Sequence, residues 1–87
     1  MKLCGTIIKN NKIIKDKIIN LNIETNYEKA LKLGISNLCN EFDIEEPYWL
    51  SVNISEYNKR NKTAFTKDNF IDFIDFDKFI IEILEDN

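Results

Sequence analysis

Four aspartates near the C-terminal end are the residues whose type and spacing come closest to a ligand-binding site. They are Asp68, Asp72, Asp75 and Asp77. Hard divalent cations bind several carboxylate oxygens at once, so this stretch is the best candidate for a cation site. It lacks the Asp-x-Asp-x-Asp-Gly run and the closing glutamate of a calcium loop. We therefore predict a solvated acidic edge without a metal, with weak cation binding as the alternative.

Catalytic chemistry has little support in the composition. The chain contains no histidine, which removes the commonest general base and metal ligand. Cys4 falls in a predicted strand, and Cys39 falls near a predicted helix C-terminus, where the helix dipole disfavours a thiolate. Gly5 and Gly34 are the only glycines, so no phosphate-cradling loop exists. We expect no enzyme, no catalytic residue, no cofactor and no small-molecule substrate, and a site built from Asp, Lys and Tyr is the alternative.

Length and composition indicate one folded domain spanning residues 1–87. The 87 residues suffice for a single core, and 44% of them are hydrophobic, which is too many for a disordered chain. The first six residues lack the long apolar run that is typical of a signal peptide, and no later stretch approaches the roughly 20 apolar residues of a membrane span. Two cysteines are too few for a disulfide framework. We expect a cytoplasmic protein without membrane contact.

Basic residues gather in the N-terminal part of the chain, although the net charge is −3. A predicted hairpin carries the basic patch of Lys9, Lys12, Lys15 and Lys17. Such a patch could bind an acidic partner or a phosphate backbone. The alternative is a solvated face that discourages aggregation between sheet edges. Aromatic and cationic residues also mix between residues 48 and 65, which is typical either of a single-strand nucleic-acid platform or of a core with amphipathic rims. We favour core and rim.

Residues 6–15 predict a β-hairpin, because two β-branched runs flank Asn10 and Asn11, a pair that tolerates a tight turn. This turn sets Lys9 opposite Lys12. The predicted pairs further along are Ile7 with Ile14, Gly5 with Asp16, and Leu3 with Ile18. One face of the hairpin is then apolar, and the other carries Cys4, Thr6, Ile8, Ile13, Lys15 and Lys17.

A helix should follow, because Thr25 and Glu28 match a capping box. Its apolar stripe comprises Tyr27, Leu31, Gly34, Ile35, Leu38 and Phe42. Gly34 within this stripe indicates either close packing on the sheet or a kink. Residues 43–47 should end the helix, since Pro47 cannot continue it.

A second, short helix is predicted over residues 53–60, with Asn53 as its cap. Residues 65–76 fit a loop, a helical turn or an extended segment equally well. Alternating residues then predict a last strand over 79–84. The predicted fold is α+β in the order ββααβ, with a small, mainly antiparallel three-stranded sheet and helices on one face.

In this fold four apolar side chains point away from the helices: Ile8, Ile13, Ile80 and Leu84. An exposed apolar face of this kind is typical of association with another protein or a second copy. We therefore predict a non-catalytic protein-interaction module, with a homodimer or an unidentified protein as partner. The alternatives are a nucleic-acid accessory protein using the basic hairpin, and a phage- or mobile-element-encoded inhibitor whose acidic residues 68–86 mimic nucleic acid toward a host nuclease.

The order of sequence features resembles a group of short uncharacterised proteins of clostridia and related low-GC bacteria. The features are a charged N-terminal hairpin, Pro47-Tyr48-Trp49-Leu50, a short helix rich in Asn, Glu, Tyr and Lys, Thr66-Lys67-Asp68-Asn69-Phe70-Ile71-Asp72, and Ile74-Asp75-Phe76-Asp77. That group has no established activity. The resemblance implies only a bacterial, free-standing, single-domain protein.

Overall fold

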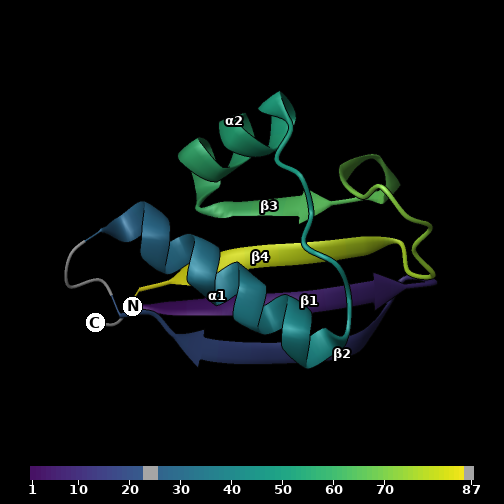
Figure 1. The fold of residues 1–87 in the computed structure, drawn as a ribbon, viewed down its shortest axis with the longest axis horizontal. Coiled ribbons are helices and arrows are strands. Elements are labelled where there is room, and N and C mark those ends of the chain that lie inside the picture. The colour runs from purple at the N-terminus through teal and green to yellow at the C-terminus, as the bar shows by residue number, and fades with distance from the viewer. Residues whose placement is uncertain (23–25, 86–87) are drawn as a thin grey trace.

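The computed structural model describes residues 1–22 and 26–85, which fold into a curved sheet with helices against it (Figure 1). The chain runs through β1 (Lys2–Lys9), β2 (Lys12–Asn20), α1 (Tyr27–Phe42), α2 (Ser51–Arg60), β3 (Lys62–Phe65), the 3-10 helix η1 (Lys67–Asn69) and β4 (Lys78–Leu84). The sheet has four strands in the order β2-β1-β4-β3, and every neighbouring pair is antiparallel.

The predicted three-stranded sheet in the order ββααβ is therefore wrong, because the prediction lacks β3. This strand pairs with β4, placing Thr63 opposite Ile81 and Phe65 opposite Phe79. With four residues it is too short for a clear alternating pattern, and one of its two buried positions is the polar Thr63. The predicted last strand is confirmed as β4.

The hairpin turn is confirmed, since Asn10 and Asn11 have φ angles of 53° and 63°, the left-handed region that such a turn needs. Lys9 lies opposite Lys12, as predicted. Beyond that point the predicted register is wrong, because the pairing shifts by one residue between Ile7 and Ile8. Ile14 is the extra residue on β2.

A one-residue shift turns every later side chain of β2 to the opposite face. Leu3 pairs with Ile19 rather than Ile18, and Ile18 pairs with Cys4 on the face away from the helices. Lys15 and Lys17, which we expected on that same face, instead reach toward the end of α1.

Helix α1 ends at Phe42, as predicted, and Asp43 closes it in a left-handed conformation with φ 57°. The predicted cap Thr25 lies outside the described residues. Asn26 serves as N-cap, its side chain accepting a hydrogen bond from the Lys29 amide at 3.1 Å. The predicted stripe is buried except for Tyr27, which is exposed.

Close packing at Gly34 is confirmed. A β-carbon placed there would lie 2.6 Å from Leu21 Cδ2 and 3.0 Å from Leu3 Cδ2. The helix backbone can approach the first strand this closely only because Gly34 lacks a side chain.

Helix α2 begins at Ser51, so the predicted start at Asn53 is wrong. Asn53 lies inside the first turn, and its side-chain oxygen accepts a hydrogen bond from the Leu50 amide at 3.0 Å. Asn53 thus provides a hydrogen-bond acceptor for the backbone amide of Leu50, the residue that caps the start of the helix.

Asn53 also belongs to a buried polar network that joins α2, β3 and η1. Its amide group donates to Thr63 Oγ1 at 2.9 Å and to the Ala64 carbonyl at 3.0 Å. Asn69 donates to Asn53 Oδ1 and to the Tyr48 carbonyl, both at 2.7 Å. Asn53, Thr63 and Asn69 are each at most 3% exposed, and no described buried side-chain polar atom lacks a partner. The network therefore avoids the cost of unpaired buried groups.

The sequence left the structure of residues 65–76 open. Phe65 ends β3, and residues 66–77 form η1 followed by an irregular segment. Within this segment, the buried side chains of Phe70 and Phe76 pack edge to face, with ring centroids 5.8 Å apart. At the far end, Asp77 accepts a hydrogen bond from the Asn10 amide and donates its own amide to the Ile8 carbonyl, both at 2.8 Å. The segment is thereby tied to the tip of the first hairpin.

Replacing Asn53 by alanine should lower the free energy of unfolding by about 3 kcal/mol, because the Leu50 amide, the Ala64 carbonyl and the Asn69 amide lose a buried partner. Urea unfolding measures this change. The same substitution at Asn58, an exposed asparagine of the same helix, should change stability by less than about 0.5 kcal/mol. Equal effects at the two positions would contradict the role assigned to the network.

Candidate interaction surface

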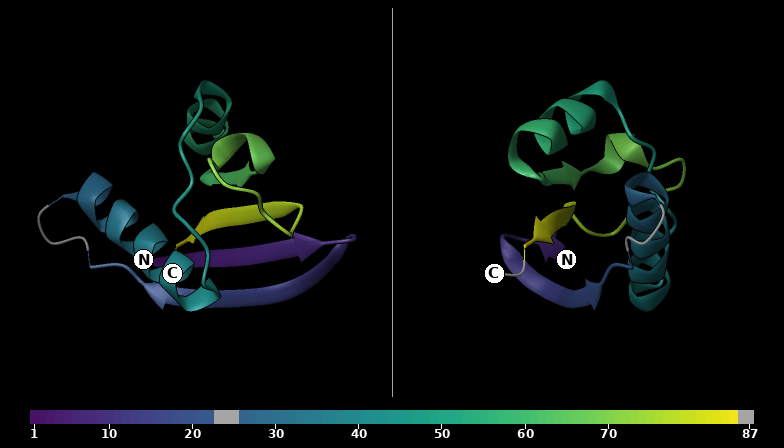
Figure 2. Two further views of the ribbon diagram at one scale, coloured as in Figure 1. Left: turned by 45° about the vertical axis from the view of Figure 1, so that its right-hand side comes forward. Right: turned by 90° about the vertical axis from the view of Figure 1, so that its left-hand side faces the viewer.

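Helix α1 packs across one side of the sheet, and α2 lies along the β3 edge, where Glu56 and Arg60 border Ala64 and Ile80. Most of the other side is left open. Helix α1 crosses β1 and β2, while α2 leads into β3 (Figure 2). Trp49 packs edge to face against both Tyr57 and Phe65. The opposite side, called the outer face from here on, consists of Lys2, Cys4, Thr6 and Ile8 of β1, Ile13, Asp16, Ile18 and Asn20 of β2, Lys62 and Ala64 of β3, and Lys78, Ile80, Glu82 and Leu84 of β4.

The structure places all four predicted contact residues on the outer face. Ile8 and Ile13 lie directly opposite each other at the hairpin tip, and Ile80 lies between Thr6 and Ala64 in the middle of the sheet. Leu84 is at the other end of β4. Ile13 is 63% exposed, and Ile18, which the predicted register had placed on the helix side, is 55% exposed. Exposed isoleucines at both ends of one strand extend the apolar surface beyond the predicted residues.

Two opposite charges flank Ile80 on the outer face. Lys78 and Glu82 lie two residues before and after it on β4, so both side chains point the same way. Lys78 is exposed and Glu82 half-buried. Neither forms an ion pair within residues 1–22 and 26–85. Each is therefore available to an opposite charge on another molecule.

Two of the four lysines of the predicted basic patch have partners inside the fold. Lys15 Nζ donates to the Phe42 carbonyl at 3.2 Å, and Lys17 Nζ lies 3.1 Å from Glu41 Oε1. The last turn of α1 contains no basic residue, so these lysines supply positive charge at the negative end of its dipole. Half of the predicted patch thus serves the packing of the hairpin against α1.

The acidic stretch does not form a metal site in the described part of the chain. Asp77 is engaged by the Asn10 amide, while Asp68, Asp72 and Asp75 are exposed. Among described residues, no three Asp, Glu, Cys or His side chains are grouped so that they could hold a metal ion.

The two cysteines lie in different environments and are not joined in a disulfide. Cys39 is buried in α1 against the core. Burial, with a smaller contribution from the charge of Glu46, raises the pKa of the Cys39 thiol to about 12. The thiol is therefore protonated at neutral pH. Cys4 is half-buried on the outer face.

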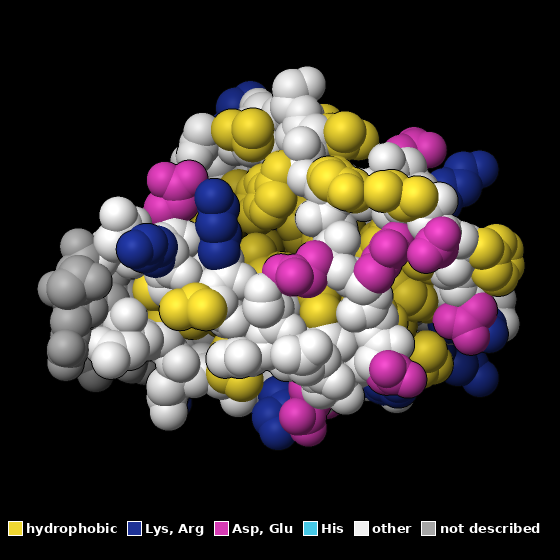
Figure 3. All heavy atoms as spheres, in the orientation of Figure 1, with side chains coloured by type: hydrophobic (Ala, Val, Ile, Leu, Met, Phe, Trp, Pro, Cys, Tyr) yellow, Lys and Arg dark blue, Asp and Glu magenta, His cyan; other side chains and the backbone are white. Residues whose placement is uncertain are grey.

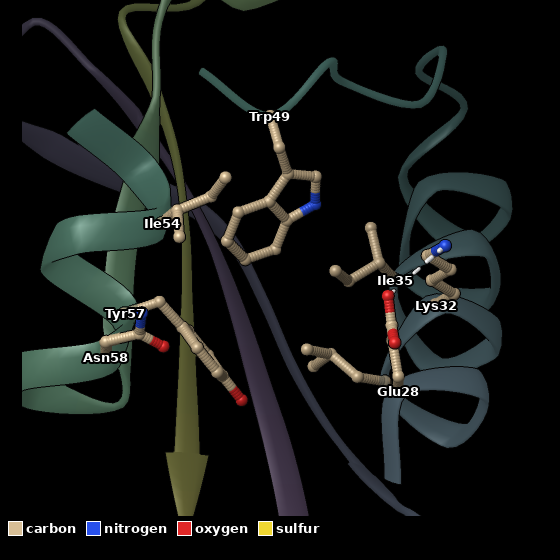
Figure 4. Close-up of a pocket in the computed structure, with 8 residues that line it drawn as sticks. Glu28, Lys32, Ile35, Trp49, Ile54, Tyr57 and Asn58 are labelled. Carbon is tan, nitrogen blue, oxygen red and sulfur yellow. Dashed lines mark ion pairs between the residues drawn. The ribbon is translucent and has the colours of Figure 1, made fainter. Parts of the chain in front are cut away.

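A pocket that the sequence did not predict separates α1 from α2, with a volume of about 480 Å³. Figure 3 shows its apolar floor between the two helices, and Figure 4 shows the side chains around it. The lining residues are Glu28, Leu31, Lys32, Ile35, Trp49, Ile54, Tyr57 and Asn58. Trp49 belongs to the segment that we interpreted as core and rim, and it packs against the core. It is half-buried and forms a wall of the pocket, packing edge to face on Tyr57 with ring centroids 5.5 Å apart.

Comparison of the chain with protein-family models, curated proteins and solved structures found no match. The resemblance to short clostridial proteins stays a prediction. Within the described residues, neither α-helix has the length and hydrophobicity that crossing a bilayer requires.

Cys39 should resist alkylation by iodoacetamide in the folded protein at pH 8. With a pKa near 12, about one thiol in ten thousand is ionised at that pH, and only the thiolate reacts. Mass spectrometry of peptides from dilute native protein should show Cys4 modified at least about tenfold faster than Cys39. In urea the two rates should converge. Equal rates in the folded state would contradict the burial assigned to Cys39.

Proposed function

We propose that this chain is a non-catalytic protein-interaction module that associates with a second copy of itself through the outer face. The observation that carries the proposal is the order Lys78-Ile80-Glu82 along β4, with opposite charges on either side of a central isoleucine. Association through a two-fold axis requires a surface that is complementary to itself. This order satisfies that requirement.

The complementarity follows from the register of the strands. Consider a two-fold axis that lies between two stacked sheets, perpendicular to the strands, along the row of Asp16, Thr6, Ile80 and Ala64. At the β2 edge it brings Asp16 near Asp16 of the second copy, an unfavourable pair that the contacts nearer the centre must outweigh. The axis places Ile80 over Ile80 of the second copy. On this face, the side chain two residues before Ile80 in one copy then lies over the side chain two residues after Ile80 in the other copy. Each Lys78 therefore faces a Glu82 of the other copy, at the roughly 10 Å sheet separation that long side chains can bridge.

The same axis matches apolar side chains. Ile8 shares its row with Lys78, and Cys4 shares its row with Glu82, so Ile8 of one copy covers Cys4 of the other. On β2, Ile13 covers Ile18. Complete burial of an isoleucine side chain contributes about 1.5–3 kcal/mol, so the exposed Ile13 and Ile18 supply an apolar driving force beside the charge pairs, with a smaller share from the half-buried Ile8.

The alternatives have weaker support. Nucleic-acid binding by the basic hairpin would rest mainly on Lys9 and Lys12, because the ammonium groups of Lys15 and Lys17 already interact with α1. Nuclease inhibition by the acidic stretch would use Asp77, which holds the hairpin tip. The proposal also assigns the protein to a bacterial cytoplasm, consistent with the two unpaired thiols.

Charge reversal on β4 tests the proposed axis. Lys78→Glu and Glu82→Lys should each raise the dimer dissociation constant by at least about tenfold, because each places two pairs of like charges across the axis. The double variant K78E/E82K exchanges the charges and should return the constant to within about threefold of the original. Sedimentation velocity over a concentration series measures all three.

Lys29→Glu is the matched control, because Lys29 is an exposed lysine on α1, away from the outer face. It should leave association unchanged. Circular dichroism checks that each variant is folded. A folded wild-type protein that remains at 10.3 kDa at every concentration would refute the proposal, as would a double variant no better than either single reversal.

A further inference from the structure

The pocket between α1 and α2 has the size and lining of a small-molecule site. Its volume of about 480 Å³ is within the usual range for such sites. Leu31, Ile35 and Ile54 supply aliphatic walls, and Trp49 and Tyr57 supply aromatic ones. The pocket is on the helix side of the sheet, so it would stay open in a dimer formed through the outer face.

Two hydrogen-bond donors border this apolar space. Figure 4 shows the nitrogen edge of the Trp49 indole turned toward Ile35 and Lys32 on α1. No acceptor among the described residues hydrogen-bonds to that indole N–H. The Lys32 ammonium has a single ion pair, with Glu28 at 3.7 Å, and both side chains are more than 70% exposed. Such a pair is worth little and exchanges readily for a stronger partner.

Apart from Glu28, the polar groups that line this pocket carry no negative charge. Tyr57 shares a hydrogen bond with the Tyr27 hydroxyl, and burial together with that bond raises the Tyr57 pKa, so its hydroxyl stays neutral. Asn58 is uncharged. Glu28 is the one anion of this lining, and it competes with a ligand for Lys32. Glu46 borders the adjoining hollow beside Lys32 and Trp49, where it accepts a hydrogen bond from Ser36.

We propose that this pocket binds a small amphipathic carboxylate, with its apolar body against Ile35, Ile54 and Tyr57 and its carboxylate between the Trp49 indole N–H and the Lys32 ammonium. The indole N–H can only donate, so it favours an acceptor on the ligand. An ammonium ligand would leave that donor unpaired and would meet the charge of Lys32. The ligand therefore carries a negative charge rather than a positive one.

Two probes with the same apolar body and opposite charge test the proposal: cyclohexanecarboxylate and cyclohexylmethylammonium. Neither absorbs where tryptophan emits, and Trp49 is the only tryptophan, so its fluorescence reports on this pocket. Chemical shifts of the Ile35 and Ile54 methyl groups locate the bound probe. We expect the carboxylate to bind with a dissociation constant at least about threefold below that of the ammonium.

Variants of the Glu28–Lys32 pair should act in opposite directions. Lys32→Gln should weaken carboxylate binding by about threefold, and Glu28→Gln should strengthen it by a similar factor, since Glu28 competes for Lys32. Lys29→Gln, on the same helix but outside the pocket lining, should have no effect. Tighter binding of the ammonium probe, or no change in Trp49 emission and in the two methyl signals up to the solubility limit of the carboxylate, would overturn the proposal.

Discussion

Helix α1 covers one side of a four-stranded sheet and α2 borders its β3 edge, so most of the other side has no cover from the described chain. This constraint determines the distribution of side chains in all four strands. Positions facing the helices are filled by large apolar residues such as Leu3, Phe79 and Ile81, each 0% exposed. The open side combines isoleucines with lysines and acids. Its mixed character suits a surface that meets water in the free chain and a second copy in an assembly.

A buried polar network acts together with the apolar core to hold the C-terminal half in place. Asn53 and Asn69 connect the start of α2, the edge strand β3 and η1 through bonds of 2.7–3.0 Å. A strand as short as β3 has few ladder hydrogen bonds, so these side-chain bonds fix its position. The network also sets α2 at a distance from α1, which leaves the pocket that Trp49 borders.

Local signals in the sequence were sufficient where a few neighbouring residues decide the structure. The Asn10-Asn11 turn, the stripe of α1 and the last strand followed from turn chemistry and periodicity. The extra residue at Ile14 was not predictable, because two adjacent isoleucines fit either face of a strand. Strand β3 was missed because its buried Thr63 depends on Asn53, ten residues away. The pocket depends on the separation of two helices, which no local pattern specifies.

The most direct test of the proposed assembly is an isotope-filtered NOE experiment on a mixture of labelled and unlabelled protein. Only contacts between copies give signals in such a sample. The account predicts cross-peaks between methyl groups of Ile80 and those of Thr6 or Ile80 in the other copy, and between Ile13 and Ile18. The absence of any intermolecular signal would contradict the account. So would intermolecular contacts that arise instead from Phe73, which lies between η1 and β4 and is 92% exposed.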